Sequence, residues 1–137
     1  MGGLDTNLLA RLLVGDDTAQ LHRVLALIRA AQEQGRLLFV PITVMLELEW
    51  VLRSRYGYDR PSISSAMAHL LETREFEFQS EDALERALHA FNEGKADFAD
   101  GLHAGLCAAA SHAPLFTFDA KAARLADVQM LQPKNGS

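Results

Sequence analysis

The chain has 137 residues, 49% of them hydrophobic, and a formal net charge of −5 from 13 basic and 18 acidic residues. This length predicts one domain with a sizeable core, which we expect over residues 1–133, followed by a disordered tail over residues 134–137. The negative charge disfavours a nucleic-acid partner, unless two divalent cations bind and reduce it from −5 to −1. Net charge therefore neither establishes nor excludes a polyanionic substrate.

Cysteine usage and the absence of long apolar segments predict a cytoplasmic protein. The single cysteine, Cys107, excludes an intrachain disulfide and lies in an Ala-rich stretch, where we expect a buried, inert thiol. The first residues carry neither the basic region nor the apolar core of a signal peptide. The longest uncharged stretch, residues 101–118, contains two histidines and a proline, so we expect no membrane segment.

The first half of the chain predicts short strands alternating with helices. A very short strand ends at Asp5 and leads into an amphipathic helix over residues 8–13. A second helix runs from about Asp17 to Gln34, and the apolar run at residues 37–40 predicts a buried strand. We expect Thr43 to cap the next helix, which continues to about residue 56.

The second half predicts the same alternation. The expected elements are a helix opening at residues 59–62, a half-exposed strand over 75–79, a helix from its cap at Ser80 to Asn92, an Ala-rich helix over 97–111, a strand over 115–118, a short helix over 120–126 and an edge strand over 128–131. Strands separated by helices predict an α/β domain with a mainly parallel central sheet and helices on both faces.

Acidic residues occur where such a sheet would have its carboxyl edge. Asp5 and Asp119 end strands, and Glu47 lies in the helix after the second strand. Asp97 and Asp100 stand three residues apart at the start of a helix, so they share one face of its first turn. Ligand crevices of parallel sheets lie at this edge, so these acids can face one crevice. Carboxylates gathered there repel each other, and Mg²⁺ or Mn²⁺ would relieve the repulsion and support phosphodiester hydrolysis.

Each acid also has an ordinary structural interpretation. Asp5 and Asp97 stand at helix N-cap positions, and Asp119 at the start of an Asx turn. Glu47 has the alternative of a solvated helix position, as we expect for its neighbour Glu49. Separately these interpretations are as good as functional ones, but together they must explain why acids from four regions arrive at one edge.

Other motifs are less informative. The five histidines lack metal-binding spacing, and we interpret most of them as surface or helix-face residues. For His103, three residues after Asp100, contact with the crevice is the less favoured alternative. There is no phosphate-binding glycine loop and no nucleophile elbow. Small residues at Gly101 and Gly105 indicate close helix packing, either within the domain or across a dimer. Four basic residues have a solvated interpretation and an alternative one as RNA phosphate contacts: Arg53, Arg55, Lys121 and Arg124.

Four blocks of the sequence resemble, in order, those of PIN-domain ribonucleases, and most closely VapC-type toxins of bacterial toxin–antitoxin pairs. The blocks are Asp5–Leu9, Thr43–Gly57, Ala96–Leu102 and Thr117–Leu125, which together span nearly the whole chain. The resemblance implies a PIN-like three-layer α/β sandwich. It also implies a Mg²⁺- or Mn²⁺-dependent endoribonuclease, usually a homodimer, that a cognate antitoxin protein holds inactive.

The resemblance assigns roles to individual residues. The residues that match the acids of the catalytic and metal site are Asp5, Glu47, Asp100 and Asp119, with Asp97 as an adjacent acid that joins the metal ligands. The residues that match polar groups orienting the acids or water are Thr6, Asn7 and Thr117.

The leading hypothesis from the sequence is hydrolysis of RNA at a metal held by Asp5, Asp100 and Asp119, with Glu47 shaping the site. One alternative is a catalytically silent PIN-fold module that binds RNA or a partner protein. Another is action on DNA, as in flap nucleases of related architecture, which the sequence disfavours because it has no segment for a helical arch.

Overall fold

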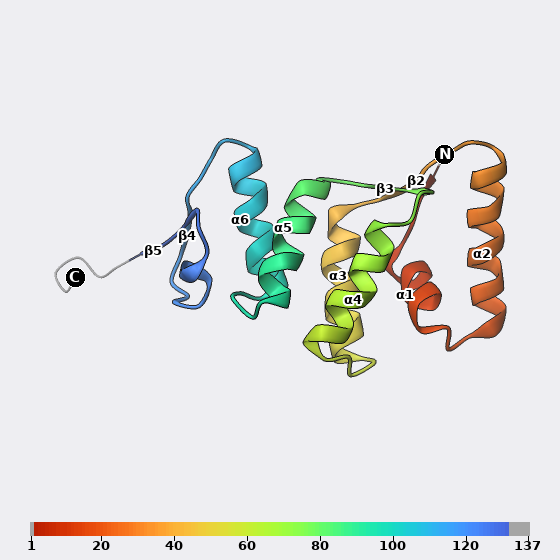
Figure 1. Cartoon of the computed structure of the whole chain (residues 1–137), viewed down its shortest axis with the longest axis horizontal. Helices are drawn as coiled ribbons and strands as arrows, with labels where there is room; N and C mark the ends of the chain where they lie inside the picture. The colour runs from red at the N-terminus through yellow and green to blue at the C-terminus, as the bar shows by residue number, and fades with distance from the viewer. Residues whose placement is uncertain (1, 132–137) are drawn as a thin grey trace. The chain divides into compact units, whose positions relative to one another are not determined.

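The computed structural model describes residues 2–131, which form a mixed α/β fold with parallel strands, as the sequence predicts, and contain six α-helices (Figure 1). The described chain divides into two compact units, one ending at Gln79 and one beginning at Ser80, and each is described by itself. The tail predicted for residues 134–137 lies outside the described residues, and the single domain over 1–133 stays a prediction. Within residues 2–131, no helix combines the length and apolar character needed to cross a membrane.

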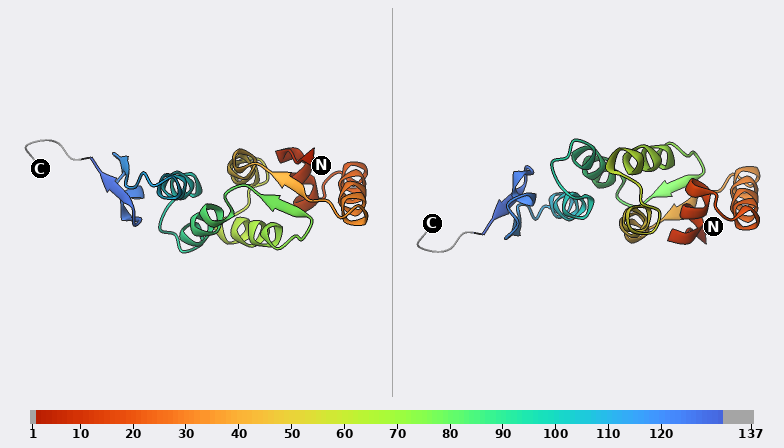
Figure 2. Two further views of the ribbon diagram at one scale, coloured as in Figure 1. Left: turned by 90° about the horizontal axis from the view of Figure 1, so that it is seen from above. Right: turned by 90° about the horizontal axis from the view of Figure 1, so that it is seen from below.

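The first unit is a three-stranded parallel sheet with four helices. Its elements are β1 (Gly2–Gly3), α1 (Thr6–Val14), α2 (Thr18–Glu33), β2 (Leu38–Val40), α3 (Ile42–Ser54), α4 (Arg60–Leu71) and β3 (Phe76–Phe78). The strand order is β1-β2-β3. Figure 2 shows β2 and β3 side by side among the helices. Because the strands are parallel, the loops that follow them lie at one edge of the sheet.

Apolar side chains of α1, α3 and α4 form the core of this unit. Leu9, Leu48, Leu52 and Ile63 are fully buried. Burying a side chain of this size stabilises a fold by about 1.5–3 kcal/mol. This core fixes α1 and α3, the two helices that carry the acids of the first unit.

The start of α3 differs from the sequence prediction. The helix begins at Ile42, with Pro41 at the N-cap position, and Thr43 is not its cap. The side-chain oxygen of Gln79 instead accepts a hydrogen bond from the backbone nitrogen of Ile42 at 2.9 Å. Gln79 also donates its backbone N–H to the carbonyl of Val40 at 3.0 Å. A residue distant in the sequence therefore supplies the cap, which the local pattern does not reveal.

The second unit consists of a helix pair and a two-stranded parallel sheet. Its elements are α5 (Glu81–Asn92), α6 (Phe98–Ala109), β4 (Leu115–Thr117), the 3₁₀ turn η1 (Ala122–Arg124) and β5 (Val128–Met130). The helix predicted over residues 120–126 is thus a single 3₁₀ turn. Phe91 and Phe98 pack edge to face at the ends of α5 and α6, with ring centroids 6.1 Å apart.

For this unit, one local prediction is correct only in position, and one is wrong. Ser80 stands at the N-cap position of α5, but its side chain makes no capping hydrogen bond. Its backbone is left-handed, with φ 53° and ψ 51°, whereas a capping side chain normally extends from β-region backbone. Cys107 is partly exposed, not buried.

Close contact between α5 and α6 explains the small residues of α6. A Cβ added at Gly101 would lie 3.0 Å from the Cα of Ala87, and one added at Gly105 would lie 3.1 Å from the Cβ of Ala83. Both distances are shorter than ordinary van der Waals contact. The prediction of helix packing within the domain is therefore confirmed. Since Asp100 directly precedes Gly101, the same packing fixes the first turn of α6.

We predict that Gly101→Ala lowers the free energy of unfolding by about 1–3 kcal/mol because the added methyl group forces α5 and α6 apart. Helix propensity alone would change stability in the opposite direction, by about 1 kcal/mol. Urea denaturation measures the difference. Adding Ala87→Gly to the variant should restore part of the loss, and a Gly101→Ala protein as stable as the parent would contradict the packing argument.

Candidate active site

Asp5 begins α1 in the first unit. Its backbone is extended, and one carboxylate oxygen accepts a hydrogen bond from the backbone nitrogen of Thr6 at 2.7 Å. Asp5 is exposed, and a carboxylate has about four lone-pair positions. Capping the helix therefore leaves acceptor capacity for a cation.

The hydroxyl of Thr6 joins α1 to α3. Thr6 is only 3% exposed, and its hydroxyl donates a hydrogen bond to Oε1 of Glu47, which is itself exposed. Asp5 and α3 both follow strands of the parallel sheet, so this contact lies at the carboxyl edge. The structure thus brings Asp5 and Glu47 into one neighbourhood. Asn7, the other polar residue predicted here, is exposed on α1.

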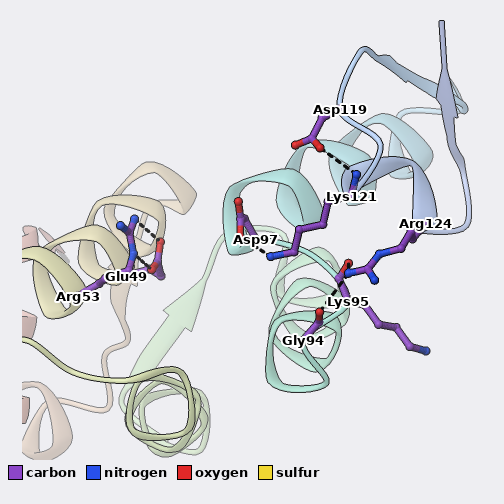
Figure 3. A network of polar contacts seen from close by, with 8 residues as sticks. All are labelled: Glu49, Arg53, Gly94, Lys95, Asp97, Asp119, Lys121 and Arg124. Carbon is purple, nitrogen blue, oxygen red and sulfur yellow. Dashed lines mark hydrogen bonds and ion pairs between the residues drawn. The ribbon is translucent and has the colours of Figure 1, made fainter. Parts of the chain in front are cut away.

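Glu49 differs from its predicted solvated state. It is 5% exposed, and its Oε2 lies 2.8 Å from the Nε of Arg53, one turn further along α3 (Figure 3). The side chain of Arg53 is half exposed. Sequence reasoning missed this pair, although the i,i+4 spacing of opposite charges was available as a signal. Arg53 therefore has a structural partner, which weakens its interpretation as an RNA contact.

Asp97 stands at the N-cap position of α6 but makes no side-chain cap hydrogen bond. Its Oδ1 lies 3.2 Å from the ammonium nitrogen of Lys121, which comes from the segment just before η1 (Figure 3). Both side chains are substantially exposed. Asp97 thus occupies the N-cap position that the sequence suggested, but its side chain does not cap the helix.

Asp119 forms an Asx turn, which is one of the two interpretations that the sequence allows for this residue. Its Oδ1 accepts a hydrogen bond from the backbone nitrogen of Lys121 at 2.9 Å. Its own backbone nitrogen donates to the hydroxyl of Thr117 at 3.0 Å, so Thr117 helps to orient this turn. Asp119 is exposed, and one residue, Phe118, separates it from the end of β4.

Asp100 lies in the first turn of α6 and has a perturbed acidity. Partial burial raises the pKa of its carboxyl, and the negative charges of Asp119 and Asp97 raise it further. The positive charges of His103 and Lys121 act in the opposite direction and are smaller influences. Asp97 and Asp119 therefore disfavour the ionised form of Asp100.

Arg124 and Arg55 are two further residues that the sequence offers as RNA phosphate contacts. Arg124 donates hydrogen bonds to the carbonyl oxygens of Gly94 and Lys95, at 3.3 and 3.1 Å, just beyond the C-terminus of α5 (Figure 3). Such a position suits a cation because helix C-termini carry partial negative charge. Arg55 is exposed at the C-cap of α3.

Among residues 2–131, no three acidic, histidine or cysteine side chains are placed to hold one metal ion together. The acids stand instead as Asp5 and Glu47 in the first unit, and as Asp97, Asp100 and Asp119 in the second. Their donors are all carboxylate oxygens, which fit hard cations such as Mg²⁺. The negative potential at Asp100 is also the kind that a cation relieves.

The family model of the PIN domain matches residues 4–128, and the chain belongs to this family. PIN domains are generally nucleases, they generally use divalent metal ions, and the family indicates RNA binding in general. The matched range includes all five predicted acids. No curated protein and no solved structure gives a significant match to the chain.

We predict that Asp100→Asn stabilises the metal-free protein near neutral pH. A raised pKa means that the folded state binds a proton more tightly than the unfolded state. The carboxyl of Asp100 therefore costs stability increasingly as the pH rises from the usual carboxyl range through the raised pKa. The gain in the variant should stay below about 1 kcal/mol because the group is partly exposed.

Thermal denaturation in chelator across pH measures this effect. The variant should have the higher Tm near neutral pH, and the difference should vanish below the usual carboxyl range. Glu85→Gln, on the exposed face of α5, is the matched control. A lower Tm for Asp100→Asn near neutral pH would contradict the electrostatic interpretation.

Proposed function

We propose that this PIN-domain protein is a Mg²⁺- or Mn²⁺-dependent endoribonuclease that hydrolyses RNA phosphodiester bonds. The observation that carries the proposal is the contact of Thr6 with Glu47 beside Asp5, in a chain of a family whose members are generally nucleases. A bound divalent cation would supply activation of water and stabilisation of charge on the phosphate oxygens. The residues proposed to hold it are Asp5, Asp97, Asp100 and Asp119, with Glu47 shaping the site.

The contacts in each unit support these roles. The buried hydroxyl of Thr6 holds Glu47 before any cation binds, which reduces the cost of assembling the site. Thr117 and the backbone of Lys121 hold Asp119 in its turn. Asp100, whose pKa is raised, gains most from a cation because binding favours its ionised form.

The biological part of the proposal is a VapC-type toxin. In this role the protein would act in the cytoplasm as a homodimer, and a cognate antitoxin would hold it inactive. Support comes from the resemblance of four sequence blocks to VapC-type toxins, which extends across most of the range matched by the PIN family. Co-purification with the product of a neighbouring reading frame, followed by loss of nuclease activity in the complex, tests this role.

We predict that Asp5→Asn and Asp100→Asn abolish RNA cleavage while the protein stays folded. Asn caps helices as well as Asp does, so Asp5→Asn should preserve the start of α1. Cleavage is measured on total RNA with Mn²⁺, with and without chelator, and Glu85→Gln should behave as the parent. Full activity in either Asn variant would refute the site, whereas RNA binding without cleavage by the parent would identify a silent binding module.

We predict that Arg55→Ala weakens RNA binding and that Arg53→Ala mainly weakens the fold. Removing an exposed phosphate contact reduces the slope of log affinity against log salt by about 0.7 for single-stranded RNA. Removing Arg53 takes an ionic partner from the buried Glu49 and should cost about 1–3 kcal/mol. Both are compared in an Asp5→Asn background, where RNA is not cleaved. An unchanged salt slope for Arg55→Ala excludes that contact.

A further inference from the structure

Lys121 contacts two of the acids of the second unit in different ways. Its ammonium nitrogen lies 3.2 Å from Oδ1 of Asp97, and its backbone nitrogen donates to Oδ1 of Asp119 at 2.9 Å (Figure 3). The first contact depends on the side-chain charge and the second only on the backbone. Substituting Lys121 therefore removes a charge from the acids while leaving the turn at Asp119 intact.

Lys121 carries one positive charge, whereas Asp97, Asp100 and Asp119 carry three negative charges when they are ionised. The negative charges of Asp119 and Asp97 act on the carboxyl of Asp100, and His103 and Lys121 act on it with the opposite sign. In the residues that the structure describes, Lys121 is the lysine that ion-pairs with one of these acids. A divalent cation would add two positive charges to this group of acids.

The ion pair of Lys121 and Asp97 is suited to exchange. The two side chains are 41% and 62% exposed, and ion pairs at such positions contribute little to stability because water competes for both charges. A lysine ammonium is a compact charge on a flexible stem, so it can move to another anion without disturbing the backbone. A phosphate oxygen of RNA is such an anion.

We propose that Lys121 is a built-in counter-cation of the acidic site. Its ammonium group pairs with Asp97 until a divalent cation takes its place. Lys121 then contacts a phosphate of the substrate. This inference rests on the proposed nuclease function and adds a specific role for one residue. In the absence of RNA, Lys121 would compete with the metal for Asp97. In the presence of RNA, Lys121 would contribute to RNA binding. A lysine that only stabilises the surface would have neither effect.

The test measures Mn²⁺ binding by titration calorimetry in the absence of RNA. Lys121→Met keeps the length of the side chain and removes its charge, so it should bind Mn²⁺ roughly three- to tenfold more tightly than the parent at low salt. The gain should shrink as salt is added, because salt screens exposed charges. Lys95→Met is the matched control, since Lys95 pairs with Glu93 at 3.1 Å in the same unit, and it should leave Mn²⁺ affinity unchanged.

A second measurement follows the affinity for a non-hydrolysable RNA analogue in the presence of Mn²⁺, in the protein with Asp5 intact. Lys121→Met should weaken RNA binding severalfold, and Lys121→Arg should retain most of it. Equal or weaker Mn²⁺ binding by Lys121→Met than by the parent overturns the proposal for Lys121 alone. Failure of the parent itself to bind Mn²⁺ overturns both this proposal and the metal-dependent nuclease, so the two failures are distinguishable.

Discussion

Repulsion between carboxylates is the constraint that governs the acids of the second unit, at the start of α6 and after β4. Asp97 and Asp119 each add negative potential at Asp100, whose carboxyl is partly withdrawn from water. A protein tolerates such an arrangement only if protons, lysine side chains or bound cations balance it. Here the pKa of Asp100 is raised, the ammonium of Lys121 lies beside Asp97, and we propose that a divalent cation also binds.

The acids of the site also have structural duties, and the two roles are compatible. Asp5 caps α1, and Asp119 closes an Asx turn. Each of these bonds uses one acceptor position of a group that has several. A local hydrogen bond also restricts the carboxylate to one orientation, which reduces the entropy lost when a ligand binds. The ordinary interpretation of these residues is therefore correct without excluding the functional one.

Packing determines where these groups can stand. In the second unit, Gly101 and Gly105 allow the backbone of α6 to approach α5, and this contact begins one residue after Asp100. In the first unit, the buried apolar face of α3 fixes the helix that presents Glu47, and the buried Thr6 restrains that side chain. The active-site chemistry that we propose thus depends on closely packed small and apolar residues that take no part in it.

The sequence by itself determined the order and type of nearly all elements, because apolar periodicity is local, and family motifs, which are also local, led to the prediction of the acids. It did not reveal the partners of those residues: Gln79 caps α3, Thr6 holds Glu47, and Lys121 lies against Asp97. A helical pattern shows which face is buried but not which distant side chain meets it, because that depends on how the chain returns through space. For the same reason, only the tertiary structure showed that the Glu49 carboxylate is buried.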